Sequence, residues 1–126
     1  MFDRIEMFQM AQSMAVHAVA RQTAMAGNVA NADTPGYRAR DAAPFAETFA
    51  AQQTDLRATR PGHVTSASAG GPVPTRFVPG EAAPNGNTVS LETEMVRAAE
   101  IRGQHERALA IYRSGLNILR TSIGRG

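Results

Sequence analysis

The residues of this chain that could do acid–base or metal chemistry are few and far apart. Its three histidines are His17, His63 and His105, and there is no cysteine. No two histidines stand four residues apart, the HExxH spacing that brings two ligands onto one face of a helix. Because a zinc site needs three or four such ligands, the sequence predicts no metal site.

The other polar residues do not form a catalytic pattern either. Glu92 and Glu94 stand at the start of a predicted helix, where the helix dipole favours acidic side chains. No serine or threonine lies in a nucleophile sequence such as GxSxG. The glycines between Gly80 and Gly86 lack the lysine and following hydroxyl of a phosphate-binding P-loop. We therefore expect a protein that is not an enzyme, with no catalytic residues and no cofactor.

Composition favours elongated helices over a compact globule. At 126 residues the chain has room for at most one ordinary domain, residues 1–126. Hydrophobic residues make up 43% of it, but many are alanines and only 6% of residues are aromatic. The net charge is +2, and all 13 basic residues are arginines spread from Arg4 to Arg125. Nucleic-acid binding usually needs a dense basic patch, so this distribution argues against it.

The sequence indicates neither a membrane span nor a cleaved signal peptide. No stretch is long and apolar enough to cross a bilayer. Polar residues follow Met1 and Phe2 at once, where a signal peptide would have an uninterrupted apolar region and a small-residue cleavage site. Composition alone therefore predicts a cytoplasmic protein.

The hydrophobic spacing predicts a first long helix over about residues 3–32. One stripe of residues, the first seam, recurs at alternating three- and four-residue steps, as in a coiled coil: Ile5, Phe8, Gln12, Ala15, Val19, Gln22, Ala26 and Val29. A second stripe of Met7, Met10, Met14 and Ala18 makes the apolar face too wide for one partner helix. The small residues of 24–27 should let another backbone approach closely.

This helix should end in a turn. Thr34-Pro35-Gly36-Tyr37 has the residue types of a type II turn, because proline pre-sets the second position and glycine tolerates a positive φ at the third. Pro35 also disfavours helix at Thr34, so the helix should stop near residue 32 or 33. Asn28 and the other short polar residues here are expected to bond the backbone locally.

Residues 37–88 lose the helical pattern and are rich in proline and glycine, so we expect an irregular segment that lies over a neighbour or is mobile. Residues 44–52 favour a short helix, with Pro44 in its first turn and Phe45 and Phe49 on one side. Residues 75–78 are typical of a brief edge strand.

A second long helix is predicted over about residues 90–123, after a turn at residues 85–87. Ser90 is the expected N-cap. The second seam is the strongest periodic pattern in the chain: Leu91, Met95, Ala98, Arg102, His105, Leu109, Tyr112, Leu116, Leu119 and Ile123. Flanking residues widen its apolar face: Val96, Ile101, Ala108, Ile111 and Ile118. We expect Arg102 and His105, as polar residues in this seam, to set register or to meet an acidic partner.

The predicted fold is all-α, with the N- and C-terminal helices forming an antiparallel coiled-coil-like pair joined by the irregular segment. A lone pair cannot cover such broad apolar stripes. We therefore expect the isolated chain to be loosely helical until self-association or a partner completes it.

The run from Asn28 to Tyr37, Asn-Val-Ala-Asn-Ala-Asp-Thr-Pro-Gly-Tyr, resembles the N-terminal signature of the flagellar axial proteins, which comprise rod, hook and hook-associated proteins. Arg38-Ala39-Arg40-Asp41 continues it as in the small proximal rod proteins, and the resemblance extends through the Leu56…Thr59…His63 spacing and the Gly86–Glu92 stretch. Asn85 stands where that family often has an acidic residue, and arginine stands where it often has lysine.

This resemblance implies a subunit of the proximal rod of the bacterial flagellum, exported by the flagellar type III apparatus without a cleaved signal and located in the periplasmic basal body. Implied partners are further copies of the chain, other rod proteins, and export-gate or ring adaptor proteins. The seams alone also fit a generic coiled-coil adaptor, and the arginines leave a small nucleic-acid binder as a third hypothesis.

Overall fold

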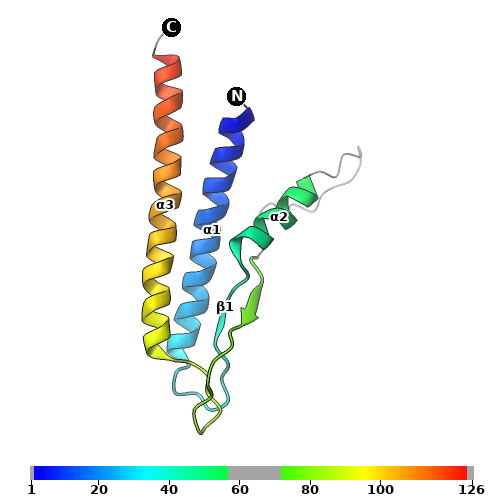
Figure 1. Ribbon diagram of the computed structural model, residues 1–126, viewed down its shortest axis with the longest axis vertical. Helices are drawn as coiled ribbons and strands as arrows, with labels where there is room; N and C mark the ends of the chain where they lie inside the picture. Colours follow the sequence, from blue (N-terminus) through cyan, green and yellow to red (C-terminus); the bar gives the residue numbers. More distant parts are fainter. Residues whose placement is uncertain (1, 57–71, 125–126) are drawn as a thin grey trace.

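Two long helices dominate the computed structural model of the chain, which describes residues 2–56 and 72–124 (Figure 1). The elements in order are α1 (Phe2–Ala30), β1 (Arg40–Ala42), α2 (Phe45–Leu56), β2 (Thr75–Phe77) and α3 (Leu91–Ile123). The predominance of helix and the two long terminal helices are confirmed. The all-α class is wrong in one respect, because the segment between them contains a small two-stranded sheet. The predictions for His63 and the neighbouring residues 57–71 lie outside the described part.

Helices α1 and α3 lie side by side, and α1 lies between α3 and α2 (Figure 1). Phe8, near the start of α1, contacts Tyr112, in the second half of α3, with ring centroids 5.4 Å apart. Asn28, near the end of α1, reaches Glu94, near the start of α3. The two helices therefore run in opposite directions, and both termini lie at one end of the molecule (Figure 1).

The contact between the two helices makes little use of the predicted seams, apart from the pair Phe8 and Tyr112. On α3 the buried residues come from the flank of the second seam: Glu94, Arg97, Ile101, Ala108 and Gly115. The large second-seam residues Leu109, Tyr112 and Leu116 remain 42–48% exposed. On α1 the buried apolar residues are Ala11, which belongs to neither predicted stripe, and Ala18, which belongs to the second stripe. The helices have come together along their smallest residues, and the large apolar ones stand beside the contact.

Gly115 shows how closely the helices approach. A Cβ at this position would lie 2.8 Å from Cε1 of Phe8, closer than van der Waals contact allows. At Gly27, in the stretch predicted to admit a neighbour, an added Cβ would meet only the Tyr37 hydroxyl, at 3.7 Å. Close packing therefore depends on a glycine of α3 that the sequence reasoning did not single out.

A small two-stranded sheet, called the hairpin below although α2 lies between its strands in the chain, packs along α1. Strand β1 pairs with β2 in antiparallel register, with Arg40 opposite Phe77. Side chains alternate between the faces of a strand, so Ala39 and Ala43 are buried while Arg38 and Arg40 are exposed. The predicted brief strand at residues 75–78 is thus confirmed as β2, and its partner β1 was not predicted.

Local predictions at the helix ends hold. Tyr37 N donates to Thr34 O at 3.2 Å and Gly36 has φ 74°, as a type II turn requires. The Ser90 side chain accepts from Thr93 N at the start of α3. In α2, Phe45 and Phe49 stack on one side with ring centroids 5.5 Å apart.

Replacing Gly115 with Leu should lower the helical content and the unfolding midpoint of the chain, because the new side chain forces Phe8 and α1 away from α3. The expected loss is about 1–3 kcal/mol of stability. Circular dichroism during urea unfolding measures it. Gly103→Leu is the matched control, because a Cβ there meets only the far end of Arg107, at 3.6 Å. Equal losses in both variants would contradict the packing described here.

Candidate assembly surfaces and the junction that positions them

Asn28 ties three segments together at the end of α1. Its side chain is completely buried. Its amide nitrogen donates to Arg40 O at 2.7 Å and to Glu94 Oε1 at 3.2 Å, and its oxygen accepts from Arg40 N at 2.9 Å and from the Tyr37 hydroxyl at 3.3 Å. The predicted local backbone bond is therefore wrong for Asn28. It instead joins α1 to the start of β1 and to α3.

A second asparagine closes the C-terminal end of α1. The amide nitrogen of Asn87 lies 2.8–2.9 Å from the carbonyl oxygens of Asn31, Ala32 and Thr34, in the turns that directly follow α1. The oxygens of Asn31 and Thr34 also accept from Thr34 N and Tyr37 N. The turn that carries Asn87 packs against the turn at Gly36: Gly36 N donates to Asn85 O at 2.9 Å. The segment just before α3 thus bonds the turns just after α1, although the two are more than fifty residues apart in the sequence.

A partly buried ion cluster extends from this junction between α1, β1 and α3. Arg97 contacts Glu94 at 2.5 Å and Asp41 at 3.4 Å. Arg21 binds both oxygens of Asp41, at 3.1 and 3.2 Å, and reaches Glu100 at 3.2 Å. Glu94 lies in the first turn of α3, as predicted, but it is only 2% exposed and has a second role in this cluster. Its Oε2 is buried and, among the described residues, has no hydrogen-bond partner.

The electrostatics of Arg21 favour this arrangement. Burial works against the charge of its guanidinium, but the hydrogen bonds to Asp41 and Glu100 outweigh burial and raise the pKa of Arg21 above its usual value. The guanidinium therefore stays charged across the physiological range, and the ties it makes do not depend on pH there.

His17 takes part in a directional chain of hydrogen bonds and not in a metal site. Its Nε2 lies 2.6 Å from Ala43 O, which can only accept, so the ring proton is on Nε2. Its Nδ1 then accepts from the Gln104 amide nitrogen at 2.7 Å, and the Gln104 oxygen accepts from Arg21 at 3.4 Å. Both nitrogens of His17 are thereby used. The described residues contain no group of three or more histidine and carboxylate side chains that could hold a metal.

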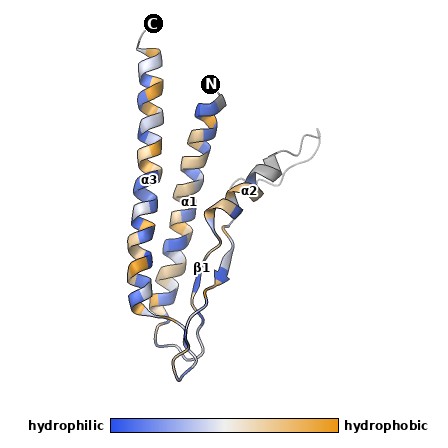
Figure 2. Cartoon of the chain, viewed as in Figure 1, coloured by the Kyte–Doolittle hydropathy of each residue, from blue (hydrophilic) through white to orange (hydrophobic). Residues whose placement is uncertain are grey.

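The exposed apolar residues of α1 and α3 flank one groove. A cavity of about 430 Å³ lies between the helices, lined by residues of both seams and by the edge of the contact: Ala18, Gln22, Met25, Ala98, Ile101, Arg102, His105 and Glu106. Because members of the first and the second seam line the same groove, the two seams lie on one side of the helix pair. Figure 2 shows apolar residues along the whole length of both helices.

Arg102 and His105 lie in the middle of this exposed side. Both are exposed, and Arg102 pairs with Glu106 of the same helix at 3.5 Å. Arg102 therefore meets an acidic residue, although one of its own helix, and since both residues are exposed they lie outside the contact between α1 and α3. That they set register or meet an acidic partner in an assembly stays a prediction.

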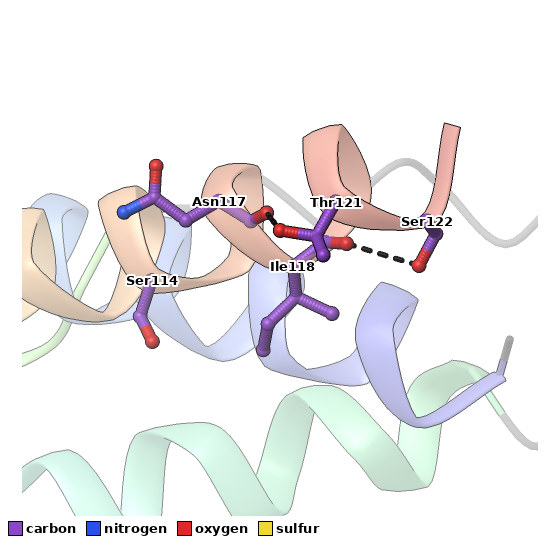
Figure 3. Close-up of a pocket in the computed structure, with 5 residues that line it drawn as sticks. All are labelled: Ser114, Asn117, Ile118, Thr121 and Ser122. Carbon is purple, nitrogen blue, oxygen red and sulfur yellow. Dashed lines mark hydrogen bonds between the residues drawn. The ribbon is translucent and has the colours of Figure 1, made fainter. Parts of the chain in front are cut away.

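A second hollow lies near the C-terminal end of α3 (Figure 3). It has a volume of about 420 Å³ and is lined by Ser114, Asn117, Ile118, Thr121 and Ser122. The hydroxyls of Thr121 and Ser122 bond carbonyl oxygens of their own helix, at 2.8 and 3.0 Å. No charged side chain lines this hollow, which therefore offers little chemistry for a small ligand.

Comparison with known proteins assigns the chain to a family. No protein-family model matches the sequence. It is 30% identical over 116 residues to the flagellar basal body rod protein FlgB of Agrobacterium fabrum, and the similarity covers 87% of each chain. The chain belongs to the FlgB family. The resemblance seen in the sequence is thereby confirmed, and FlgB is named as a rod protein and not as an enzyme.

In this FlgB-family chain the first residues of the signature lie at the junction. Asn28 and Asn31 begin the resemblance, and the structure places them at the point where α1, β1 and the turn before α3 meet. Sequence reasoning did not assign Asn87, Arg97 or Asp41 to the junction. Asn87 and Asp41 act on distant residues, and Arg97 joins its near neighbour Glu94 to the distant Asp41. Asparagine next to glycine at residues 86–87 was the one available indication, and it also fits an ordinary turn.

Replacing Asn28 with Asp should strongly destabilise this FlgB-family chain, although the two side chains have the same shape. The change removes both donor bonds and buries a second negative charge beside Glu94, for an expected loss of about 3–5 kcal/mol. Asn31→Asp is the control, because the Asn31 amide is only half-buried and donates only to Gly27 O; its expected cost is about 1 kcal/mol or less. Urea unfolding of both variants measures the difference, and an equally mild effect would contradict the role of Asn28.

Proposed function

We propose that this chain is a structural subunit of the proximal part of the flagellar rod and polymerises through its terminal helices into the shaft that transmits torque. Membership of the FlgB family supports the placement in the rod. The observation that carries the assembly step is the exposure of the large apolar residues on one side of α1 and α3.

The exposed residues argue for assembly because of their number and their arrangement. Ile5 and Val19 on α1 and Leu109, Tyr112 and Leu116 on α3 are each 42–55% exposed. A monomer rarely leaves so long an apolar face in water, and such faces mark interaction sites. Contacts made by one side of a subunit on a different surface of the next do not close into a dimer but continue into a helical polymer.

The proposal includes a location and partners. The chain passes through the flagellar export apparatus without a cleaved signal peptide and resides in the periplasmic part of the basal body. Its neighbours there are further copies of itself, other rod proteins, and export-gate or ring adaptor proteins. No helix in the residues the structure describes has the length and apolar character to cross a membrane.

Deleting the gene tests the function. We expect deletion to abolish swimming and to remove the rod from isolated basal bodies, and the intact chain supplied from a plasmid to restore both. Normal swimming without the gene would contradict the proposal. A generic coiled-coil adaptor, the alternative that the seams also fit, would leave the rod in place when it is deleted.

Replacing Leu116 or Leu109 with Asp should leave the isolated chain as helical as before but abolish its incorporation into basal bodies. Both side chains are more than 40% exposed within one copy, so the charge stays in water until assembly buries it. Circular dichroism measures the first effect, and immunoblots of purified basal bodies measure the second. Arg113→Asp is the control, since Arg113 is exposed and already charged. Normal incorporation of the Leu variants would show that the second seam is not an assembly surface.

A further inference from the structure

The outer face of the hairpin carries two arginines that have no carboxylate partner among the described residues. Arg38 and Arg40 stand on alternate positions, so both point away from the buried face formed by Ala39 and Ala43. Arg76 on the neighbouring strand differs, because it pairs with Glu47 of α2. The hairpin therefore presents two unneutralised cations to its surroundings.

Phe77 holds both guanidinium groups in place. The Cζ atoms of Arg38 and Arg40 lie 4.0 and 4.4 Å from the centroid of its ring, within the range of a cation–π contact. The ring itself is 47% exposed. Two like charges beside one ring repel each other unless an anion lies between or above them. The cluster is thus ordered before any partner arrives and is incomplete without negative charge.

The geometry favours carboxylates carried by a helix. A guanidinium is a planar fork that matches a carboxylate bidentately. Residues two apart on a strand are about 6–7 Å apart, and residues three apart on one face of a helix are about 5–6 Å apart. Asp3 and Glu6, in the first turns of α1, have this helical spacing. Both are exposed and, within residues 2–56 and 72–124, neither forms an ion pair.

We propose that Arg38 and Arg40 of one copy bind Asp3 and Glu6 of a second copy. The start of α1 and the hairpin lie toward opposite ends of the molecule (Figure 1), so one copy cannot satisfy its own arginines. The contact joins two different surfaces and repeats from copy to copy, which gives a polymer a longitudinal link in addition to its apolar sides. This inference rests on the proposed function, because it assigns a contact within the rod.

Charge reversal tests the contact in cells that lack the native gene copy. Arg38→Glu with Arg40→Glu should lower the amount of chain in isolated basal bodies, relative to the amount exported, by roughly tenfold or more, because like charges then face each other. Asp3→Arg with Glu6→Arg should have the same effect. Combining all four changes should restore incorporation to within about twofold of the unmodified chain, because the ion pairs reform with opposite polarity.

A second four-residue variant controls for overall charge. It combines the two arginine reversals with Asp33→Arg and Glu81→Arg, which change two other exposed carboxylates. It has the same net charge as the restoring variant and should remain defective. Dividing by the exported amount separates assembly from any effect of the α1 changes on export.

Three results would overturn the inference. One is normal incorporation of the arginine reversals. Another is equal rescue by the two four-residue variants. In the third, the Asp3 and Glu6 reversals fail to rescue the arginine reversals, and the purified arginine variant no longer binds dextran sulfate. The partner would then be an anionic polysaccharide. Failure of the proposed function differs from all three, since the unmodified chain would then itself be absent from basal bodies.

Discussion

The fold depends on one buried amide. Asn28 belongs to α1. Its side chain bonds the backbone N and O of Arg40 in β1 and donates to the Glu94 carboxylate in α3. A buried amide that loses one of these partners costs more than the bond itself contributes, because the orphaned group stays out of water. The positions of the hairpin and of the last helix relative to the first are therefore set together. The ion cluster of Arg21, Asp41 and Arg97 extends the same polar contact further along the helices.

This polar junction explains why the large apolar side chains lie outside the helix contact. The small residues Ala11, Ala18, Ala108 and Gly115 bring the helix axes close together. Ion pairs and amides then fill the contact toward the junction, and little space is left for bulky side chains. Leu109, Tyr112 and Leu116 consequently remain beside the contact, on the side of the groove. The monomer is held by its polar interior, and its apolar side chains are left for the neighbours that the proposed function supplies.

Much of the secondary structure could be predicted from the sequence, because it depends on local chemistry. Helical spacing, the Ser90 N-cap, the glycine at the third position of a type II turn and the stacked pair Phe45 and Phe49 each involve residues within a few positions of one another. The register between the helices could not be predicted. A periodic pattern shows which residues share a face, but the most apolar stripe and the most closely packed one differ here. The junction roles of Glu94, Arg97, Asp41 and Asn87 could not be predicted for a related reason, since each makes a contact with a distant segment, although Glu94 and Arg97 also pair three residues apart.

The hollow beside Thr121 and Ser122 is lined by residues of α3 alone, and the helix around it is largely exposed, with Ile123 78% exposed. Buried polar groups hold the helices together at the junction, and the close packing of Phe8 on Gly115 holds them nearer the termini. Amide hydrogens should thus exchange more slowly near Ile101 than near Ile118. A subunit built this way can adjust the last turns of α3, beyond Gly115, to neighbours of different curvature without disturbing the junction.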